Sequence, residues 1–282
     1  MVNLIAKLLS SLPLSMIHHV GAGFGRLFHA LIPSTKAILV ENLQHSGLFA
    51  EGDACDKAIE ANIAESGKTI IESLAMWAAD DKRVLGWVKQ VKGWEHVEQA
   101  VAQGKGIIFL TPHLGSFEIT SVYYAAKHPI TVLYRPPRKK WLETLMNKGR
   151  SKGQVHLAPT NRVGVKMLLQ ALHRGEAIGI LPDQIASKGE GEWAPFFGRP
   201  AYTMALVSRL AEKTGAAVLM AFGERLPKGQ GFVIHLTKLD TADVATPTLL
   251  NLAIETQVRQ APLQYLWNYN RHKGYLTPDQ PV

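Results

Sequence analysis

The sequence predicts an α/β protein with a mostly parallel central sheet, helices on both faces of that sheet, and an N-terminal membrane-associated helical segment. Short runs of uninterrupted apolar residues bounded by glycine or proline, at 106–111 and 177–183, are typical of strands buried on both faces. They alternate with segments whose apolar residues recur every three or four positions, which indicates helices. With 282 residues, 46% of them hydrophobic, the chain is long enough for one large core.

The expected elements follow one another without an internal repeat or a low-complexity linker. Glycine after the last apolar position predicts where two of the helices end. In chain order we expect helices at 38–47 and 55–78, strands at 106–111, 130–135 and 154–158, a helix at 163–175, a strand at 177–183, a helix at 203–215, strands at 216–225 and 232–239, and a helix at 246–262. Residues 37–282 are therefore predicted to form a single α/β domain.

The N-terminal segment, residues 1–36, is apolar but poorly suited to cross a bilayer. The 18 residues between Lys7 and Arg26 contain no charged side chain, which is near the lower limit for a spanning helix. They also contain Pro13, two histidines and three glycines. We therefore expect a membrane-associated hairpin or interfacial helix, with Lys7, Arg26 and Lys36 near lipid headgroups. The alternative is an ordinary amphipathic helix packed on the core.

Charge and cysteine content narrow the classes of partner. The net charge is +8 and the pI about 9.5, so the surface attracts polyanions such as nucleic acid, anionic lipid or an acidic protein. Basic residues are spread along the chain and the aromatic residues form no obvious stacking platform, which disfavours nucleic acid. The single Cys55 excludes an internal disulfide, and no cluster of Cys and His suggests zinc.

The stretch FLTPHLGSFE, residues 109–118, places His113 just after a predicted buried strand. Ligands of open α/β sheets bind at that edge, so the position favours function. Five residues of straight helix would separate the side chains of His113 and Glu118 by about 140°. The two can meet only if the chain bends first, which Gly115 permits, with Ser116 available to cap the next helix. Such a pair would combine an imidazole base with a carboxylate that orients it.

The same stretch resembles the H-x4-[DE] motif of the glycerolipid acyltransferase superfamily. Within it, the chain is similar to the lipid A late acyltransferases of Gram-negative bacteria over most of its length. Four further segments resemble that family in the same order: ILVENLQHSG, LYRPPRKKWLETLMNKGR, ILPDQIASKGEGEWAPFFGRPA and APLQYLWNYNRHKGYLTP. Two departures are Ser116-Phe117 in place of Asn-Trp and the absence of Phe-Pro after the early Asn-Leu.

The resemblance implies transfer of a fatty acyl chain from acyl carrier protein to a hydroxyl of a lipid A precursor. It implies that His113 is the general base, that Glu118 orients it, and that no covalent acyl-enzyme forms. The implied partners are acyl carrier protein, a lipid A precursor with its phosphates and acidic sugars, and the cytoplasmic face of the cell inner membrane. An acyl-enzyme is not expected because the thioester is already activated, and neither a cofactor nor a metal is expected beside this co-substrate. An acidic carrier protein also suits a chain of net charge +8.

Several further residues are candidates for substrate binding. Arg135 follows a predicted strand and is a candidate to bind a phosphate or polarise the thioester, while Arg162 opens a helix and can reach a phosphate bidentately. Asp183 and Gln184 follow another strand, where Asp183 is expected to orient a neighbour. Three groups carry weaker expectations: Phe196 and Phe197 as an acyl pocket, Arg138, Lys139 and Lys140 as a basic patch, and Arg271 and Lys273 as a tail returning to the site.

Three alternatives stay open. The same catalytic pair would serve acylation of another lipid or of a polyene. A metal-dependent hydrolase would use His113, Glu118 and Asp183 as ligands, although the sequence has no HExxH motif. A non-catalytic protein that binds membranes or polyanions would account for the charge and the apolar N-terminus, but not for the His and Glu at a strand end.

Overall fold

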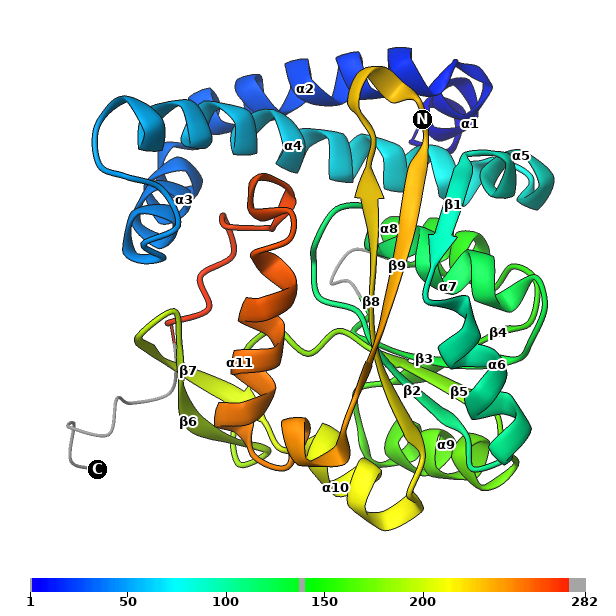
Figure 1. Cartoon of the computed structure of the whole chain (residues 1–282). Helices are drawn as coiled ribbons and strands as arrows, with labels where there is room; N and C mark the ends of the chain where they lie inside the picture. Colours follow the sequence, from blue (N-terminus) through cyan, green and yellow to red (C-terminus); the bar gives the residue numbers. More distant parts are fainter. Residues whose placement is uncertain (1, 137–139, 274–282) are drawn as a thin grey trace.

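A computed structural model describes residues 2–136 and 140–273, without the side chains of residues 140–142. A central sheet runs through the molecule with helices on both sides (Figure 1). The helices are α1 (Val2–Ser11), α2 (Leu14–Leu31), α3 (Pro33–His45), α4 (Asp53–Ala78), α5 (Asp81–Gly86), α6 (Trp94–Gln103), α7 (Phe117–Ala125), α8 (Lys140–Arg150), α9 (Arg162–His173), α10 (Leu206–Thr214) and α11 (Pro247–Val258).

The sheet has seven strands, and every pair in it is parallel except β8–β9. Its order is β1 (Val88–Lys92), β9 (Phe232–Leu239), β8 (Ala217–Arg225), β2 (Ile107–Leu110), β5 (Ala177–Ile180), β3 (Ile130–Tyr134) and β4 (Val155–Pro159). The prediction of a mostly parallel sheet is therefore confirmed. Its central strands are buried on both faces, as their continuous apolar runs indicated.

Alternation along the strands divides the core into two layers. Ile107 and Phe109 of β2 point into a cluster with α4, α6 and α7, whereas Ile108 and Leu110 point into a cluster with α9, α10 and α11. This is the twofold period of side chains along a strand. Helices thus cover both faces of the sheet, as predicted.

Two strands that the sequence did not predict form a separate hairpin, β6 (Gly191–Phe196) and β7 (Arg199–Met204). Phe197 and Gly198 connect them with φ of 46° and 74°, the positive values that a tight two-residue hairpin turn needs. The helix expected at 203–215 consequently begins later, as α10. Edge strand β1 was also missed, because its polar sequence VKQVK lacks an apolar run.

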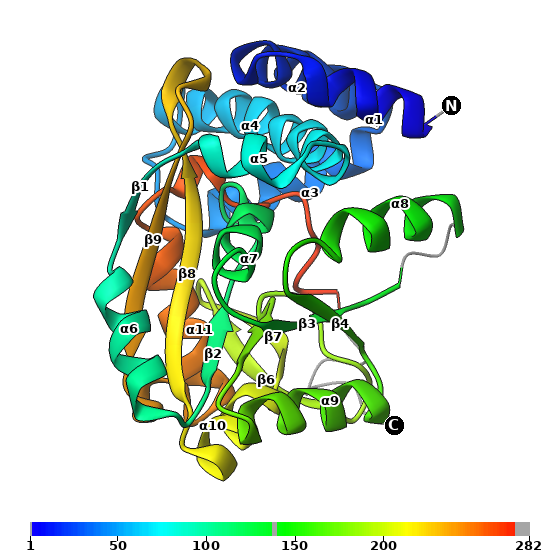
Figure 2. The same ribbon diagram turned by 90° about the vertical axis from the view of Figure 1, so that its right-hand side faces the viewer.

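The N-terminal helices are joined closely to the body of the protein. Helix α2 packs along α4, and a Cβ at Gly25 would lie 2.2 Å from the carbonyl oxygen of Ile63. A Cβ at Gly67 of α4 would equally meet the backbone of Gly21 and Gly25. Figure 2 shows α1, α2 and α4 stacked at one end of the molecule, with α8 next to α4. The boundary predicted at residue 36 falls inside α3.

One face of the N-terminal helices exposes large apolar side chains. Leu4, Leu8, Met16, Val20, Leu27 and Leu31 are each exposed by roughly half or more of their surface. Lys7, Arg26 and Lys36 are also exposed. Within the described residues, none of the helices combines the length and apolarity that a membrane span requires. This face has the composition of a helix that lies in a membrane interface.

Candidate active site

The candidate site lies at the carboxyl edge of the parallel strands. His113 follows β2, Asp183 follows the neighbouring β5, and Arg135 follows β3. Consecutive parallel strands bring their carboxyl ends to one edge of the sheet, so residues 70 positions apart become neighbours. The sequence position of His113 at this edge is as predicted.

Asp183 holds His113 through two hydrogen bonds. Its Oδ1 lies 2.8 Å from the ring Nδ1 of His113, and its Oδ2 accepts the backbone N–H of the same residue, also at 2.8 Å. A carboxylate only accepts hydrogen bonds, so Nδ1 carries the proton and Nε2 keeps its lone pair. The histidine is thereby fixed both in its ring orientation and in the tautomer that a general base requires.

Asp183 is buried against the C-terminal tail. The phenol of Tyr265 and the buried guanidinium of Arg271 both lie close to its carboxylate. Burial alone would raise the pKa of Asp183, but the His113 ring and its hydrogen bonds, with Arg271, outweigh burial and lower it. The same surroundings, burial first and the Asp183 charge second, raise the pKa of Tyr265 well above its usual value. Asp183 is thus ionised, and Tyr265 stays neutral.

The second ring nitrogen of His113 faces a cleft. The side-chain nitrogen of Gln184 lies 3.2 Å from His113 Nε2, so the amide donates to the lone pair that a substrate hydroxyl would use. His113 and Gln184 both line this cleft, whose volume is about 580 Å³. A hydroxyl that replaced the amide could pass its proton to Nε2.

Glu118 does not hold His113, and the predicted contact between them is wrong. Its carboxylate is bound by Arg150, whose Nε lies 2.9 and 3.1 Å from the two oxygens and whose Nη2 forms a further contact. The cause is the turn at Gly115, where φ is +58° and a Cβ would lie 2.1 Å from the carbonyl oxygen of Gly223. Helix α7 begins right after this turn and carries Glu118 to Arg150. Ser116 precedes α7 but its buried hydroxyl forms no cap.

The cleft contains some of the predicted binding residues and not others. Arg135 lines it together with Gln184. Arg162 is not among the described residues that line the cleft: it is exposed at the start of α9, and the neighbouring Asn161 lines the cleft instead. Arg271 does return to the site, as expected from the tail, whereas Lys273 is exposed. Arg138 and Lys139 lie outside the described residues, as does the side chain of Lys140.

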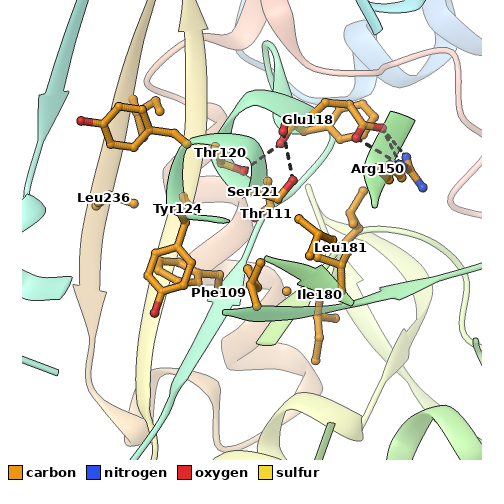
Figure 3. A pocket seen from close by; sticks show the side chains of 18 of the residues that line it. Phe109, Thr111, Glu118, Thr120, Ser121, Tyr124, Arg150, Ile180, Leu181 and Leu236 are labelled. Atoms are coloured by element: carbon orange, nitrogen blue, oxygen red, sulfur yellow. Dashed lines mark hydrogen bonds and ion pairs between the residues drawn. The ribbon is translucent and has the colours of Figure 1, made fainter. Parts of the chain in front are cut away.

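A second cavity lies on the other side of Glu118, beneath α7. Its volume is about 40 Å³ and its lining is mostly apolar, with aromatic rings from Phe109 and Tyr124. Figure 3 places Arg150 and Leu181 on one side of it and Leu236 on the opposite side. Arg150 and Leu181 also line the cleft of His113, so the two spaces adjoin.

Phe196 and Phe197 were predicted to form an acyl pocket. Neither is among the described residues that line the cleft or this cavity, and both instead line a separate space of about 10 Å³ beside Trp267. Both are buried in the core, where Phe197 packs against Trp267 at 5.3 Å between ring centroids and Phe196 faces Tyr265. The residues that the sequence did not single out are Arg150 and Tyr265. Each lies inside a family-like segment, but nothing in the spacing connects Arg150 to Glu118 or Tyr265 to Asp183.

Comparison with known proteins identifies the family of this chain. Residues 1–274 match the family described as bacterial lipid A biosynthesis acyltransferase. The chain belongs to this family. It is thus a transferase of acyl groups in lipid A biosynthesis, as the resemblance in sequence indicated. A metal-dependent hydrolase would need His113, Glu118 and Asp183 to bind one ion. Among the described residues, no three or more His, Cys, Asp or Glu side chains lie close enough together to hold a metal ion.

Individual relatives agree on the family and differ in the acyl group. The chain is 25% identical to the lipid A biosynthesis lauroyltransferase of Escherichia coli K12, over 94% of this chain and 88% of that protein. It is also 25% identical to the palmitoleoyltransferase of the same organism, over 93% and 86%. A lipid A biosynthesis acyltransferase of Haemophilus influenzae is 24% identical over 95% and 87%. Overall similarity therefore does not select one chain length.

Proposed function

We propose that this protein is an O-acyltransferase that moves a fatty acyl chain from acyl carrier protein to a hydroxyl of a lipid A precursor. The observation that carries the proposal is a histidine whose tautomer is fixed by a buried, ionised aspartate and whose second ring nitrogen faces a large cleft, in a member of the lipid A acyltransferase family. Neither a cofactor nor a metal takes part in the proposed reaction.

His113 acts as the general base. Its Nε2 removes the proton of the acceptor hydroxyl as that oxygen attacks the thioester carbonyl, and Asp183 stabilises the imidazolium that forms. The tetrahedral intermediate then releases the thiolate of the carrier protein, which takes the proton back from His113. The acyl group passes directly from sulfur to oxygen, so no covalent acyl-enzyme forms. Gln184, bound to Nε2 in the free protein, gives way to the acceptor hydroxyl.

The acyl chain occupies the apolar cavity beneath α7. This cavity adjoins the cleft of His113 through Leu181 and Arg150, so a chain whose carbonyl lies near His113 has an apolar space within reach. A volume of about 40 Å³ is smaller than a fatty acyl chain, so entry requires α8 and its Arg150 to shift. The ion pair between Arg150 and Glu118 lies in the wall of the cavity in the free protein.

The N-terminal helices attach the enzyme to the cytoplasmic face of the inner membrane. Their exposed apolar side chains and the cations Lys7, Arg26 and Lys36 suit insertion beside anionic headgroups. This arrangement keeps the catalytic cleft near a lipid acceptor while leaving it accessible to a soluble carrier protein.

Mass spectrometry of the product tests the proposal. Purified protein is incubated with acylated carrier protein and a lipid A precursor, and lipid A is also analysed from a knockout strain complemented with the wild type or with His113→Ala. We expect one additional acyl chain, present with the wild type and absent with the variant. Unchanged lipid A in every arm would refute the assigned acceptor. A search of the total lipid extract would then reveal whether another lipid is acylated.

A further inference from the structure

Helix α10 presents two cations to the cleft of His113. Arg209 and Lys213 are four residues apart and therefore lie on the same face of the helix. Leu206 and Leu210 of the same helix line the cleft with them. This face is thus mixed, with two positive charges on an apolar support, and no part of the proposed chemistry uses it.

These cations have no carboxylate partner among the described residues. Three arginines whose side chains are partly or fully buried do have one: Arg150 binds Glu118, Arg199 binds Glu41 and Arg225 binds Glu72. Two like charges four residues apart on a helix repel each other, which is unfavourable unless an anion lies between them.

The cleft as a whole carries an excess of positive charge. Arg135 joins Arg209 and Lys213 in its wall, and Glu190 is the one described wall residue that brings an unpaired carboxylate. Arg150 adds no charge, because Glu118 neutralises it. A dianion is therefore the kind of group that would balance the charge of this wall.

We propose that Arg209 and Lys213 bind a phosphate monoester of the acceptor lipid, in a cleft whose wall also contains Arg135. The proposal rests on the proposed function. A guanidinium can bind phosphate oxygens through two parallel hydrogen bonds, and an ammonium adds a point charge. The neighbouring apolar residues suit the hydrocarbon of the same ligand. A phosphate is also present in the prosthetic arm of a carrier protein, so the experiment separates the two sources.

The test is steady-state kinetics on Arg209→Gln/Lys213→Gln with two acceptors, the phosphorylated precursor and the same lipid after phosphatase treatment. For the wild type, we expect removal of the phosphate to raise the acceptor KM by roughly 10- to 100-fold, the range for hydrogen bonds to a charged group. The variant should show that higher KM with both acceptors, with kcat and the carrier-protein KM within about twofold of the wild type.

A matched control removes two charges far from the cleft. Lys89→Gln/Lys92→Gln lies on β1, at the opposite edge of the sheet from β3 and β4, and changes the net charge equally. It should leave the acceptor KM unchanged. An equal loss in this control would assign the effect to general electrostatic attraction and overturn the site.

Two further outcomes contradict the proposal. If the α10 variant raises the carrier-protein KM instead, the phosphate belongs to the donor. If its acceptor KM rises by the same factor with and without the phosphate, these side chains do not recognise it. Absence of transfer by the wild type with any acceptor would instead refute the proposed function, which distinguishes the two failures.

Discussion

Among the described residues, two histidines are bound to buried carboxylates, and one of the two faces a cleft. His113 is held by Asp183 at 2.8 Å, and His18 of α2 is held by Glu72 of α4 at 3.1 Å. Each pair has an arginine close by, Arg271 in the first and Arg225 in the second. Each imidazole also lies near a phenylalanine ring.

The difference lies in which nitrogen is used and in what surrounds the carboxylate. In the His18 pair, Nε2 of the histidine forms the hydrogen bond with Glu72. Arg225 binds the same carboxylate through Nε and Nη2 at 2.8 and 2.6 Å. Asp183 binds Nδ1 of His113 and leaves Nε2 toward the cleft, while Arg271 donates to Thr203 and Asn251 instead. A buried His–carboxylate pair is therefore no evidence of catalysis until its free nitrogen reaches a cavity.

The largest expected contrast is between the two histidines themselves. His113→Ala should lower kcat by about 10²- to 10⁴-fold, the usual contribution of a general base, with little change in thermal stability. His18→Ala should lower the melting temperature while the folded enzyme keeps its kcat. Activity per folded molecule and circular dichroism melting curves measure both. Equal losses of kcat in the two variants would contradict the assignment of His113 as catalytic and His18 as structural.

Two variants test whether Asp183 or Glu118 is the carboxylate that orients His113. Asp183→Asn should lower kcat by about 10²-fold, because the amide no longer selects the tautomer. Glu118→Gln should act through Arg150, leaving a partly buried cation unpaired and destabilising the protein. The double variant Glu118→Gln/Arg150→Met should then recover stability and part of the activity. If it recovers neither, and Glu118→Gln alone matches Asp183→Asn, Glu118 contacts the reacting groups in the complex.

Removal of the Glu72 carboxylate should lower the free energy of unfolding and leave kcat unchanged. Burial alone would raise the pKa of Glu72, but Arg225 and His18 overcome this and lower it to about 2. Against the usual value of 4.5, this shift corresponds to about 3 kcal/mol of unfolding free energy at neutral pH. Urea denaturation of Glu72→Gln should show a loss of that order, with kcat per folded molecule unchanged. A stability equal to the wild type would contradict this assignment.

The same pair predicts a pH dependence. Since the pKa of Glu72 is lower in the folded state, its stabilisation is complete above about pH 4.5 and is lost as pH falls toward 2. The stability difference between wild type and Glu72→Gln should thus shrink by about 2 kcal/mol between pH 6 and pH 3. Urea denaturation across this range measures it. A constant difference would place the stabilisation in packing instead of charge.

The smallest expected effect concerns acyl length. Gly179 of β5 lines the apolar cavity, and an added methyl would meet Val132 at 3.3 Å, which a small shift accommodates. Gly179→Ala should therefore shorten the preferred acyl chain by about one or two carbons without loss of fold. Competition between acyl carrier proteins of different chain length, read by mass spectrometry, measures the preference. An unchanged preference would exclude this cavity as the acyl site.

Local pattern predicted most of the fold because each buried strand and helix carries its own apolar period, and it placed His113 correctly at the sheet edge. It did not predict the partner of His113, since Asp183 is 70 residues away and the two meet only through the pairing of β2 with β5. Glu118 was near in sequence but is carried away by the turn at Gly115. Phe196 was expected in an acyl pocket, but it is buried beside Tyr265 and outside the wall of the His113 cleft.

The glycine contact between α2 and α4 has a mechanical consequence. With Gly21 and Gly25 against Gly67, the two backbones touch, so α2 cannot slide along α4 without a backbone clash, and α4 in turn packs in the core against the sheet. If α1 and α2 lie in the membrane as proposed, the distance of His113 above the bilayer is a constant of the fold. The enzyme would then acylate those hydroxyls of a lipid that lie at the same distance from the bilayer surface as His113.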